Sequence, residues 1–391
     1  MVTYFGEVLV IGAGLSGAVI GRTLAEAGIR VEVVDERSHV AGNCHTERDG
    51  DSGVMVHVHG PHIFHTDNEE VWSFVNEHAN FRPFVLRMKA TSDGQVYSLP
   101  VNLHTINQLF GQHFNPTQAE AFVQTKRIPC ADIQSFEEFA LAELGREIYE
   151  AFFYDYPVKH WGVSPQLLPA SVIKRLPIRY NYDDNYFSHK FQGIPDEGYT
   201  AMVESILDHP LITVRLGTRV SRDEVSSSRW TFYSGTLDGW FDYRYGMLRY
   251  RTLEFKNEIH KGDFQGCAVM SYPDQSVEYA RVIEHKHFLP HESYAKTVVS
   301  YQFARDAEKN DIPYYPMRLV GDKSALSDYV ALADAEPATT FVGRLGTYRY
   351  LDMDVTIREA LVTARRFLDE RESGSAHQSF YFDPLTSGER A

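Results

Sequence analysis

Cysteine is scarce in this chain of 391 residues. The three cysteines are odd in number and far apart in the sequence, at Cys44, Cys130 and Cys267. Such usage argues against a disulfide framework and favours a reducing compartment. The first apolar run begins almost at once and no basic segment precedes it, so we expect no signal peptide and a cytoplasmic protein.

Long apolar runs and an excess of positive charge are also missing. No apolar run approaches the roughly 20 residues that a membrane span requires, so we expect no span. The formal net charge of -15 argues against nucleic acid as a partner, although a few local arginines could still bind a phosphorylated substrate. A hydrophobic content of 43% is normal for a globular protein, and the length predicts two or more domains.

The chain does contain a strand, a glycine turn, a helix, a second strand and an acid in succession between Val8 and Asp35. This is the context of a dinucleotide-binding GxGxxG motif. Gly12 permits the tight turn, Gly14 lets the backbone approach a pyrophosphate, and Gly17 lets the helix pack against the strand. The N-terminus of the helix offers free N–H groups to the phosphates. Asp35 is placed to accept a hydrogen bond from a ribose hydroxyl.

Two further stretches extend this fingerprint. Arg37 lies just past the acid, and the small-residue pair Ala41-Gly42 follows it, a pattern that resembles glutathione-reductase-type flavoproteins and favours FAD over NAD. Near the other end of the chain a strand runs into the turn Gly343-Arg344. An amphipathic helix is expected over 355–370, and its N-terminus could face the anionic edge of a flavin.

Two groups of histidines raise the question of a metal site. The first contains His57, His59, His62 and His65, and the second contains His285, His287 and His291. Acidic and cysteine ligands at the usual spacing are missing around the first group, so we expect no metal. We expect instead a strand and a Gly60-Pro61 turn against a cofactor ring, with His62 or His65 near it. The second group is expected on the faces of strands.

Two kinds of pattern divide the middle of the chain. Helical periodicity runs from about residue 102 to 168, with a helix start at Asn115-Pro116. A capping box at Ser135 opens what we expect to be one helix reaching Phe152. Alternation over 83–101 and 247–303 predicts strands.

An aromatic and basic segment over 152–187 lacks clear periodicity and indicates a functional loop. Aromatic faces bind uracil and sugar rings, and arginines bind phosphates in bidentate fashion. We therefore expect Trp161 and Tyr186 to stack on a ligand.

Together these residues resemble one family, the bacterial-type, flavin-dependent UDP-galactopyranose mutases. The resemblance covers nearly the whole chain. The motifs that carry it are, in order, GPHIFHT (60–66), KHWG (159–162), KRLPIRYNYDDNYF (174–187), FDYRYG (241–246), RVIEHKHF (281–288), PYYP (313–316) and GRLGTYRYLDMD (343–354). A GxGxxG motif alone is weak evidence, whereas this ordered set is specific.

The resemblance implies an α/β fold, with a Rossmann-like FAD-binding domain, an inserted helical domain and a small antiparallel β-sheet domain. The expected boundaries are 1–82, 200–246 and 317–391 for the discontinuous FAD-binding domain, 102–199 for the helical insertion with a mobile substrate loop at about 162–195, and 83–101 with 247–316 for the sheet.

The resemblance also implies an activity. Family members are isomerases of the intramolecular transferase type that interconvert UDP-galactopyranose and UDP-galactofuranose. The reaction is redox-neutral yet needs reduced FAD, because the flavin N5 forms a covalent adduct with the galactose anomeric carbon and displaces UDP. A cellular flavin reductant, a product used in cell-wall polysaccharide biosynthesis, and a homodimer or higher homo-oligomer are therefore expected.

Site residues follow from the resemblance, motif by motif. Arg175, in the mobile loop, and Arg281 are expected to bind the pyrophosphate, and with His62 they form the expected catalytic set. The expected substrate contacts are Phe152, Tyr156, Trp161, Arg175, Tyr186, Arg251, Arg281, Tyr315 and Tyr350. The expected cofactor contacts are Gly12, Gly14, Leu15, Ser16, Gly17, Asp35, Glu36, Arg37, Gly42, Asn43, His59, His62, Arg344, Tyr350, Asp352 and Met353.

Two places depart from the family pattern. Ser271 stands where many relatives place an asparagine near the sugar, and residues 83–90 match poorly. Two other functions also fit parts of the sequence. A flavin-dependent oxidoreductase of the amine-oxidase type would share both glycine turns, but the arginines and tyrosines disfavour the apolar cavity it needs. A nucleotide-sugar-binding protein without catalysis would share the whole site.

Overall fold

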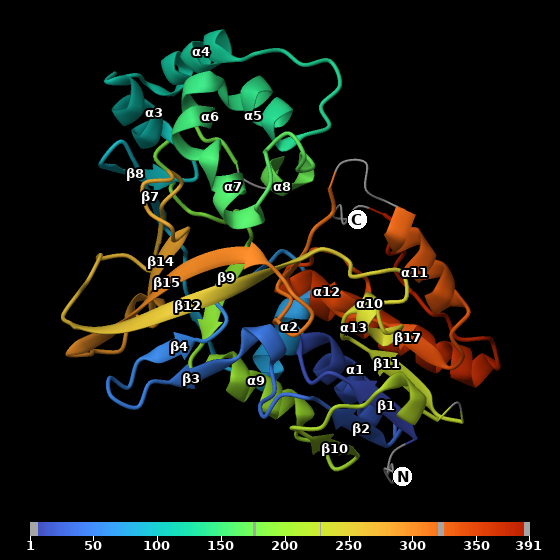
Figure 1. Ribbon diagram of the computed structural model, residues 1–391. Coiled ribbons are helices and arrows are strands. Elements are labelled where there is room, and N and C mark those ends of the chain that lie inside the picture. Colours follow the sequence, from blue (N-terminus) through green and yellow to red (C-terminus); the bar gives the residue numbers. More distant parts are fainter. Residues whose placement is uncertain (1–6, 175–176, 227, 320–323, 387–391) are drawn as a thin grey trace.

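A five-stranded parallel sheet forms one end of the molecule in the computed structural model (Figure 1). The structure describes residues 7–174, 177–226, 228–319 and 324–386. The sheet has the order β10-β2-β1-β11-β17, with β1 at Val8–Ile11, β2 at Val31–Val34, β10 at Ile212–Arg215, β11 at Trp230–Tyr233 and β17 at Thr339–Phe341. β11 pairs in parallel with β1.

Helices cover both faces of this sheet because its strands are apolar on both sides. Val8 and Val10 face one layer, whereas Leu9 and Ile11 face the other, as the twofold period of a strand requires. The first layer contains α1 (Leu15–Glu26), α2 (Glu69–His78), α9 (Gly198–Leu207) and α13 (Met353–Ser373). The second contains α10 (Leu237–Trp240) and α11 (Ser324–Asp334), and α12 (Gly343–Gly346) follows β17.

A seven-stranded sheet crosses the middle of the molecule, in the order β16-β12-β15-β14-β13-β7-β8. Its strands are β7 (Met88–Ser92), β8 (Gln95–Leu99), β12 (Tyr250–Lys261), β13 (Val269–Ser271), β14 (Arg281–Glu284), β15 (Lys296–Asp306) and β16 (Tyr315–Pro316). All neighbours are antiparallel except β13 and β7. These two strands come from distant parts of the chain, so no hairpin fixes their direction.

The alternation predicted that the histidines of the second group lie on strand faces, and this prediction is wrong. β14 ends at Glu284, and His285–Phe288 forms a 3-10 helix. His285 is buried there because its ring bonds the Ser300 hydroxyl at 2.7 Å and accepts the His57 amide at 3.2 Å. The polar ring therefore finds its partners in the core.

Six helices pack together above the seven-stranded sheet (Figure 1). They are α3 (Leu103–Phe110), α4 (Pro116–Lys126), α5 (Phe136–Leu144), α6 (Arg146–Phe152), α7 (Asp155–Trp161) and α8 (Ser171–Lys174). The predicted helix starts at Asn115 and Ser135 are confirmed, each with a capping box. The single helix expected to reach Phe152 is wrong, because Gly145 adopts a φ of 80° and separates α5 from α6.

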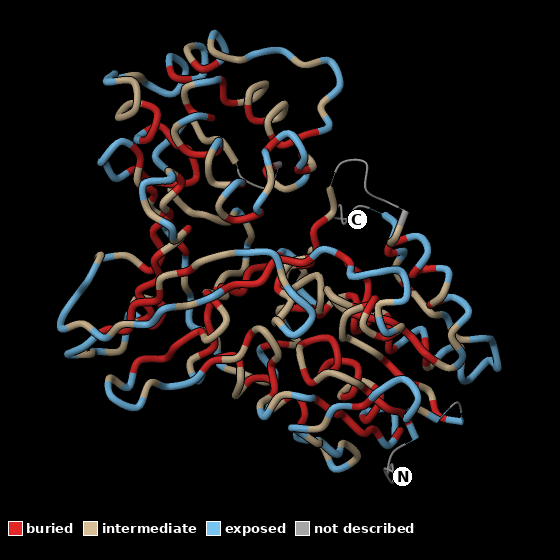
Figure 2. The backbone as a smooth tube through the Cα atoms, in the orientation of Figure 1, coloured by how far each residue is buried: buried red, intermediate tan, exposed pale blue. Residues whose placement is uncertain are grey.

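Smaller elements connect these layers. They are β3 (Thr46–Arg48) with β4 (Met55–His57), β5 (Phe64–Thr66) with β6 (Phe81–Pro83) and β9 (Phe191–Pro195), and two 3-10 turns at Gly42–Cys44 and Arg222–Glu224. Figure 2 shows buried backbone in both large sheets and in the helices that pack on them. Among the described residues, no helix is both long and apolar enough to cross a membrane.

Glu284 anchors the end of β14 although it is completely buried. Its carboxylate accepts the backbone N–H groups of Phe264, Gln265 and Gly266 at 2.8–3.1 Å, and His287 lies 3.2 Å away. Burial alone would raise the pKa of Glu284, but the His287 bond and the backbone N–H groups lower it from 4.5 to about 2. The stability that this carboxylate contributes is present above about pH 4.5 and is lost as pH falls toward about 2.

Replacing Glu284 with Gln is expected to flatten the acid side of the stability profile. The thermal midpoint of the wild type should fall more steeply than that of Glu284→Gln as pH drops from about 4.5 toward 2. Circular dichroism melts at several pH values measure this. Glu278→Gln removes an exposed carboxylate and should follow the wild type. Parallel acid limbs for the wild type and Glu284→Gln would contradict the assignment.

Candidate functional site

The glycines in the turn between β1 and α1 lack side chains for different reasons. Gly12 has a φ of 110°, and a Cβ there would lie 2.0 Å from the Ser234 hydroxyl. A Cβ on Gly17 would lie 1.9 Å from the Gly12 carbonyl oxygen, so α1 needs this glycine to pack. Gly14 is different, since its φ of -78° suits any residue and its Cβ would meet only the Gly42 Cα, at 3.9 Å. Its missing side chain therefore leaves an open cradle, suited to close approach of a ligand.

Asp35, at the end of β2, holds this turn in place. Its carboxylate accepts the Ala13 N–H at 2.7 Å and the Arg37 N–H at 2.9 Å. A carboxylate has about four lone-pair sites, so acceptor capacity remains for a ribose hydroxyl. Glu36, another expected cofactor contact, is exposed and lies 3.9 Å from Arg219. The structure therefore brings Asp35, but not the Glu36 carboxylate, to the glycine turn.

Buried polar atoms without a protein partner lie beside the cradle. Arg37 donates from Nη2 to the Asn43 amide oxygen at 2.8 Å, but its Nη1 has no hydrogen-bond partner among the described residues. His59 Nδ1 bonds the Tyr314 hydroxyl at 2.8 Å, and its Nε2 is likewise without one in the part of the chain described. Unpaired buried polar groups are costly. These two atoms, together with the open cradle, fit a bound dinucleotide with polar atoms of its own.

His62 follows the Gly60-Pro61 turn, as predicted, and is held in one tautomer. Its Nδ1 lies 2.8 Å from the Gly60 carbonyl oxygen, which can only accept, so Nδ1 carries the hydrogen and Nε2 is the acceptor. Burial and then the nearby Arg344 charge lower the pKa of His62 to about 4. The ring is therefore neutral at pH 7. His65 instead stacks on Phe187 at 3.7 Å.

The second glycine turn meets the first. A Cβ on Gly343 would lie 2.5 Å from the Ser16 hydroxyl in the first turn of α1, where Leu15 is buried. Asp352 is the N-cap residue of α13 and Met353 its first residue. The cofactor contacts expected from the two ends of the sequence are thus brought together.

Arg344 lies between the cradle and a second region. It donates to the carbonyl oxygens of Leu351 and Tyr314. Its guanidinium lies 4.9 Å from the Tyr350 ring centre and 5.7 Å from that of Tyr315. Both tyrosines also line a cavity on the other side.

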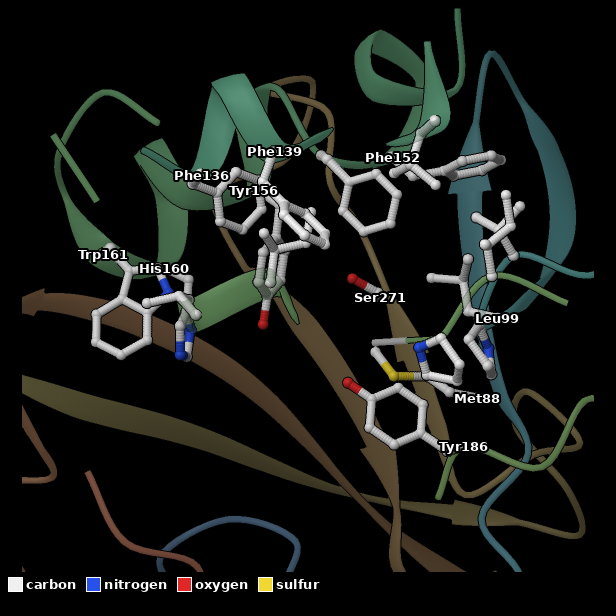
Figure 3. Close-up of a pocket in the computed structure, with 18 of the residues that line it drawn as sticks. Met88, Leu99, Phe136, Phe139, Phe152, Tyr156, His160, Trp161, Tyr186 and Ser271 are labelled. Carbon is white, nitrogen blue, oxygen red and sulfur yellow. The ribbon is translucent and has the colours of Figure 1, made fainter. Parts of the chain in front are cut away.

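This cavity, of about 200 Å³, lies between the helices α5–α8 and the seven-stranded sheet (Figure 3). Side chains from the helices form an apolar end, with Phe136, Phe139 and Phe152. The sheet side includes Met88, Leu99, Ser271 and Arg281. Tyr156, Trp161, Tyr186, Tyr315 and Tyr350, all expected to touch substrate, are also in its wall.

Arg281 supplies the positive charge of the cavity. Its Nη2 donates to the Tyr156 hydroxyl at 2.5 Å, while its Nε is buried without a hydrogen-bond partner among the described residues. Burial alone would lower the pKa of Arg281, but its tyrosine neighbours raise it above the ordinary value. The guanidinium is therefore charged and has donor capacity left for an anion.

Sequence reasoning missed several residues around these sites. Tyr314 reaches His59, whereas its neighbour Tyr315 lines the cavity, and only Tyr315 had been assigned. His160 stacks on the Tyr156 ring at 5.3 Å. Met88 lies in the poorly matching segment and yet lines the cavity. Alternation in PYYP could have separated the two tyrosines, but no local signal shows which face meets the cavity.

One arginine expected at the substrate has its donors used elsewhere. Arg251 is absent from the cavity wall, because its Nε donates to the His160 carbonyl oxygen at 3.0 Å and its Nη1 to Asp306 at 2.5 Å. It holds the C-terminal end of α7, where a Cβ on Gly162 would lie 2.4 Å from its Nη1. Arg175 lies outside the described residues.

Comparisons with known proteins show which proteins the chain resembles. A family model described as UDP-galactopyranose mutase matches residues 151–350, and one described as NAD(P)-binding Rossmann-like domain matches residues 10–78. The chain is 52% identical to a probable UDP-galactopyranose mutase of Klebsiella pneumoniae, over 93% of this chain and 94% of that protein. It is 51% identical to the dTDP-fucopyranose mutase of Escherichia coli, over 93% and 98% of the two chains.

The fold is similar to that of two solved structures. A crystal structure of reduced UDP-galactopyranose mutase covers 98% of this chain, and this chain covers 100% of it, with a TM-score of 0.73 at 14% identity. A putrescine oxidase matches over 93% of this chain and 99% of its own length, with a TM-score of 0.60 at 12% identity. The Rossmann-like domain and the matched UDP-galactopyranose mutase family model imply a flavin cofactor.

Substitutions in the glycine turn should separate ligand binding from folding. Gly14→Val places a side chain in the cradle without a protein clash, so the purified variant should retain about a tenth or less of the wild-type flavin. The melting temperature of its flavin-free form should stay near that of the flavin-free wild type. Gly17→Val, with its clash against Gly12, should lower that temperature. Normal flavin content in Gly14→Val would show that the cradle is not the binding site.

Proposed function

Because the chain belongs to the UDP-galactopyranose mutase family, we propose that it interconverts UDP-galactopyranose and UDP-galactofuranose. The reaction is an intramolecular transfer without net redox change. It uses FAD in its reduced form, which when bound supplies an electron-rich N5 as nucleophile for the anomeric carbon. The remaining roles belong to side chains of this protein.

The observation that carries the proposal is the position of Arg281. It is a charged guanidinium in a cavity whose wall includes Tyr315 and Tyr350, and these two rings also contact Arg344 beside the glycine cradle. A nucleotide sugar that placed its diphosphate on Arg281 could point its sugar toward the cradle and its base toward the apolar end. This order suits departure of a nucleoside diphosphate from the sugar.

Each side chain then has a defined task. Arg281 neutralises the diphosphate during C–O cleavage, and the Tyr156 hydroxyl orients the guanidinium. Tyr186, Tyr315 and Tyr350 offer further hydroxyls to the phosphates. Phe152 provides a ring for the base, and Trp161, which packs against Tyr315 and Tyr350, contacts the substrate nearer the cradle. Neutral His62 presents Nε2 as a hydrogen-bond acceptor toward the flavin side.

Arg175 is proposed as a second cation for the diphosphate, from its sequence motif alone. Two guanidiniums from opposite sides would link binding to closure of the segment that carries Arg175. We also keep the proposed domain boundaries, a homodimeric or larger assembly, a cellular flavin reductant and a product used in cell-wall polysaccharide synthesis. A cytoplasmic location is proposed because all three cysteines are free thiols.

Chromatography of anaerobic reactions tests the proposal. The holoprotein reduced with dithionite should convert UDP-galactofuranose into UDP-galactopyranose, and the oxidised holoprotein should convert little. A binding protein without catalysis would show no conversion in either state. Equal rates of conversion by the reduced and the oxidised holoprotein would show that the reaction does not need reduced flavin.

Replacing Arg281 with Ala should lower kcat/KM by at least about tenfold, or 1.4 kcal/mol, because the diphosphate loses its charged partner. Flavin content should remain at the wild-type level. Arg305→Ala is the matched control, since Arg305 lies on the same sheet in exposed ion pairs with Glu254 and Asp311. It should change kcat/KM by no more than about twofold. Near-native turnover of folded, flavin-loaded Arg281→Ala would overturn the assignment.

A second substrate is favoured by one comparison. The Escherichia coli relative that is 51% identical is named a dTDP-fucopyranose mutase. That substrate adds a methyl group on the base, lacks the 2′-hydroxyl of the ribose, and replaces a hydroxymethyl group on the hexose with methyl. Apolar residues are present at both places where such methyl groups could lie, including Phe136 and Phe139 near one end and Met88 near Ser271.

Four substrates separate these choices: UDP and dTDP, each joined to galactose or to fucose. Under reducing conditions we expect the largest kcat/KM with UDP-galactose. A preference of more than about tenfold for dTDP-fucose, or about 1.4 kcal/mol, would assign the second function instead. The two mixed substrates show whether the nucleotide or the hexose decides.

A further inference from the structure

Lys159 makes an unusual pair of contacts next to the cavity. Its ammonium on α7 donates to the carbonyl oxygens of Tyr272, at 2.6 Å, and Asp274, at 2.8 Å. Both carbonyls lie in the loop 272–280, which joins β13 to β14. This loop starts directly after Ser271 and ends directly before Arg281, and these two residues are paired across the strands.

Two more contacts join α7 to the same hairpin. The Asp155 carboxylate accepts the Gln275 side-chain N–H at 2.7 Å. Asp155 and Lys159 are four residues apart and therefore lie on one face of the helix. Tyr156 bonds Arg281 at 2.5 Å. Lys159 and Asp155 thus join α7 to the loop 272–280, and Tyr156 joins the same helix to Arg281 in the cavity wall.

Stabilisation of the fold alone does not account for the environment of Lys159. Burial lowers its pKa to about 8, although Asp274 and Asp155 act in the opposite direction. An ammonium is usually solvated or paired with a carboxylate, and removing it from water carries a cost. Here it bonds two backbone carbonyls that lie beside the cavity wall. This placement favours a role in shaping the site.

We propose that Lys159 is a positioning residue for the diphosphate: by fixing α7 to the loop 272–280, it holds the Tyr156 hydroxyl on the Arg281 guanidinium. This proposal rests on the proposed function for the identity of the ligand. Lys159 itself does not line the cavity. Its loss should allow α7 and the hairpin to move apart, so the guanidinium would bind the diphosphate less well. Binding should suffer more than the chemical step.

UDP binding to the oxidised holoprotein, measured by titration calorimetry, tests this proposal independently of turnover. Lys159→Met should weaken UDP binding by about tenfold. Lys159→Arg, which can still donate to both carbonyls, should recover most of the affinity. Lys286→Met is the matched control, because Lys286, in the 3-10 helix after β14, also donates to a backbone carbonyl, that of Gly262 at 2.7 Å. It should bind UDP as the wild type does.

A double-mutant cycle separates positioning from general loss of structure. If Lys159 acts through the Tyr156–Arg281 bond, Lys159→Met should cost much less affinity in a Tyr156→Phe background. Steady-state assays should show the Lys159→Met effect mainly in KM. Native UDP affinity in Lys159→Met, full additivity with Tyr156→Phe, or an equal loss in Lys286→Met would overturn the proposal. If the variants change UDP affinity as predicted but the protein converts no sugar, the proposed function alone would be rejected.

Discussion

The charge of Arg281 is available to a ligand because its hydrogen-bond partner in the described part of the chain is a tyrosine hydroxyl and not a carboxylate. A carboxylate would neutralise the guanidinium and compete with an anionic ligand. A hydroxyl fixes the direction of the guanidinium and leaves its charge in place. Burial raises the pKa of the neighbouring Tyr315, so its phenol is also neutral at physiological pH. The site thus presents a positive charge among neutral donors, which is suited to a diphosphate.

The rest of the fold supplies supports for this arrangement. Glu284 fixes one end of β14, the strand that begins with Arg281. Arg251 fixes the C-terminal end of α7, and Lys159 joins α7 to the β13–β14 loop. Arg344 then connects the cavity to the glycine cradle through Tyr350. Each support is a charged group with most of its donors or acceptors used inside the protein.

Local patterns in the sequence predicted the parts of the fold that depend on neighbouring residues. The glycine turn, the helix start at Asn115, the capping box at Ser135, and the first parallel strands are examples. The helix prediction failed at Gly145. The neighbours of Gly145 have good helical periodicity, but a Cβ at this position would clash with the carbonyl of Lys126, which is distant in the sequence. The parallel pairing of β13 with β7 was also outside the reach of local patterns, because it joins segments far apart in the sequence.

The candidate site was predictable to the extent that a motif marks it. Tyr156, Trp161 and Arg281 were found through family motifs, and the structure places all three at the cavity. Arg251 was assigned to the substrate by the same route, but the structure gives its donors to α7 and Asp306. Motif matching identifies a residue without showing which way it points. Glu36 illustrates the same limit, since its neighbour Asp35 faces the turn while Glu36 faces solvent.

The stoichiometry of turnover tests the central claim most directly. In a sealed anaerobic cell, the flavin of the holoprotein is reduced once and the excess reductant is removed before UDP-galactofuranose is added. The account predicts many sugars converted per flavin, while the flavin spectrum stays that of the reduced form. Conversion that stops after about one sugar per flavin, with the flavin oxidised, would contradict it and indicate an oxidoreductase.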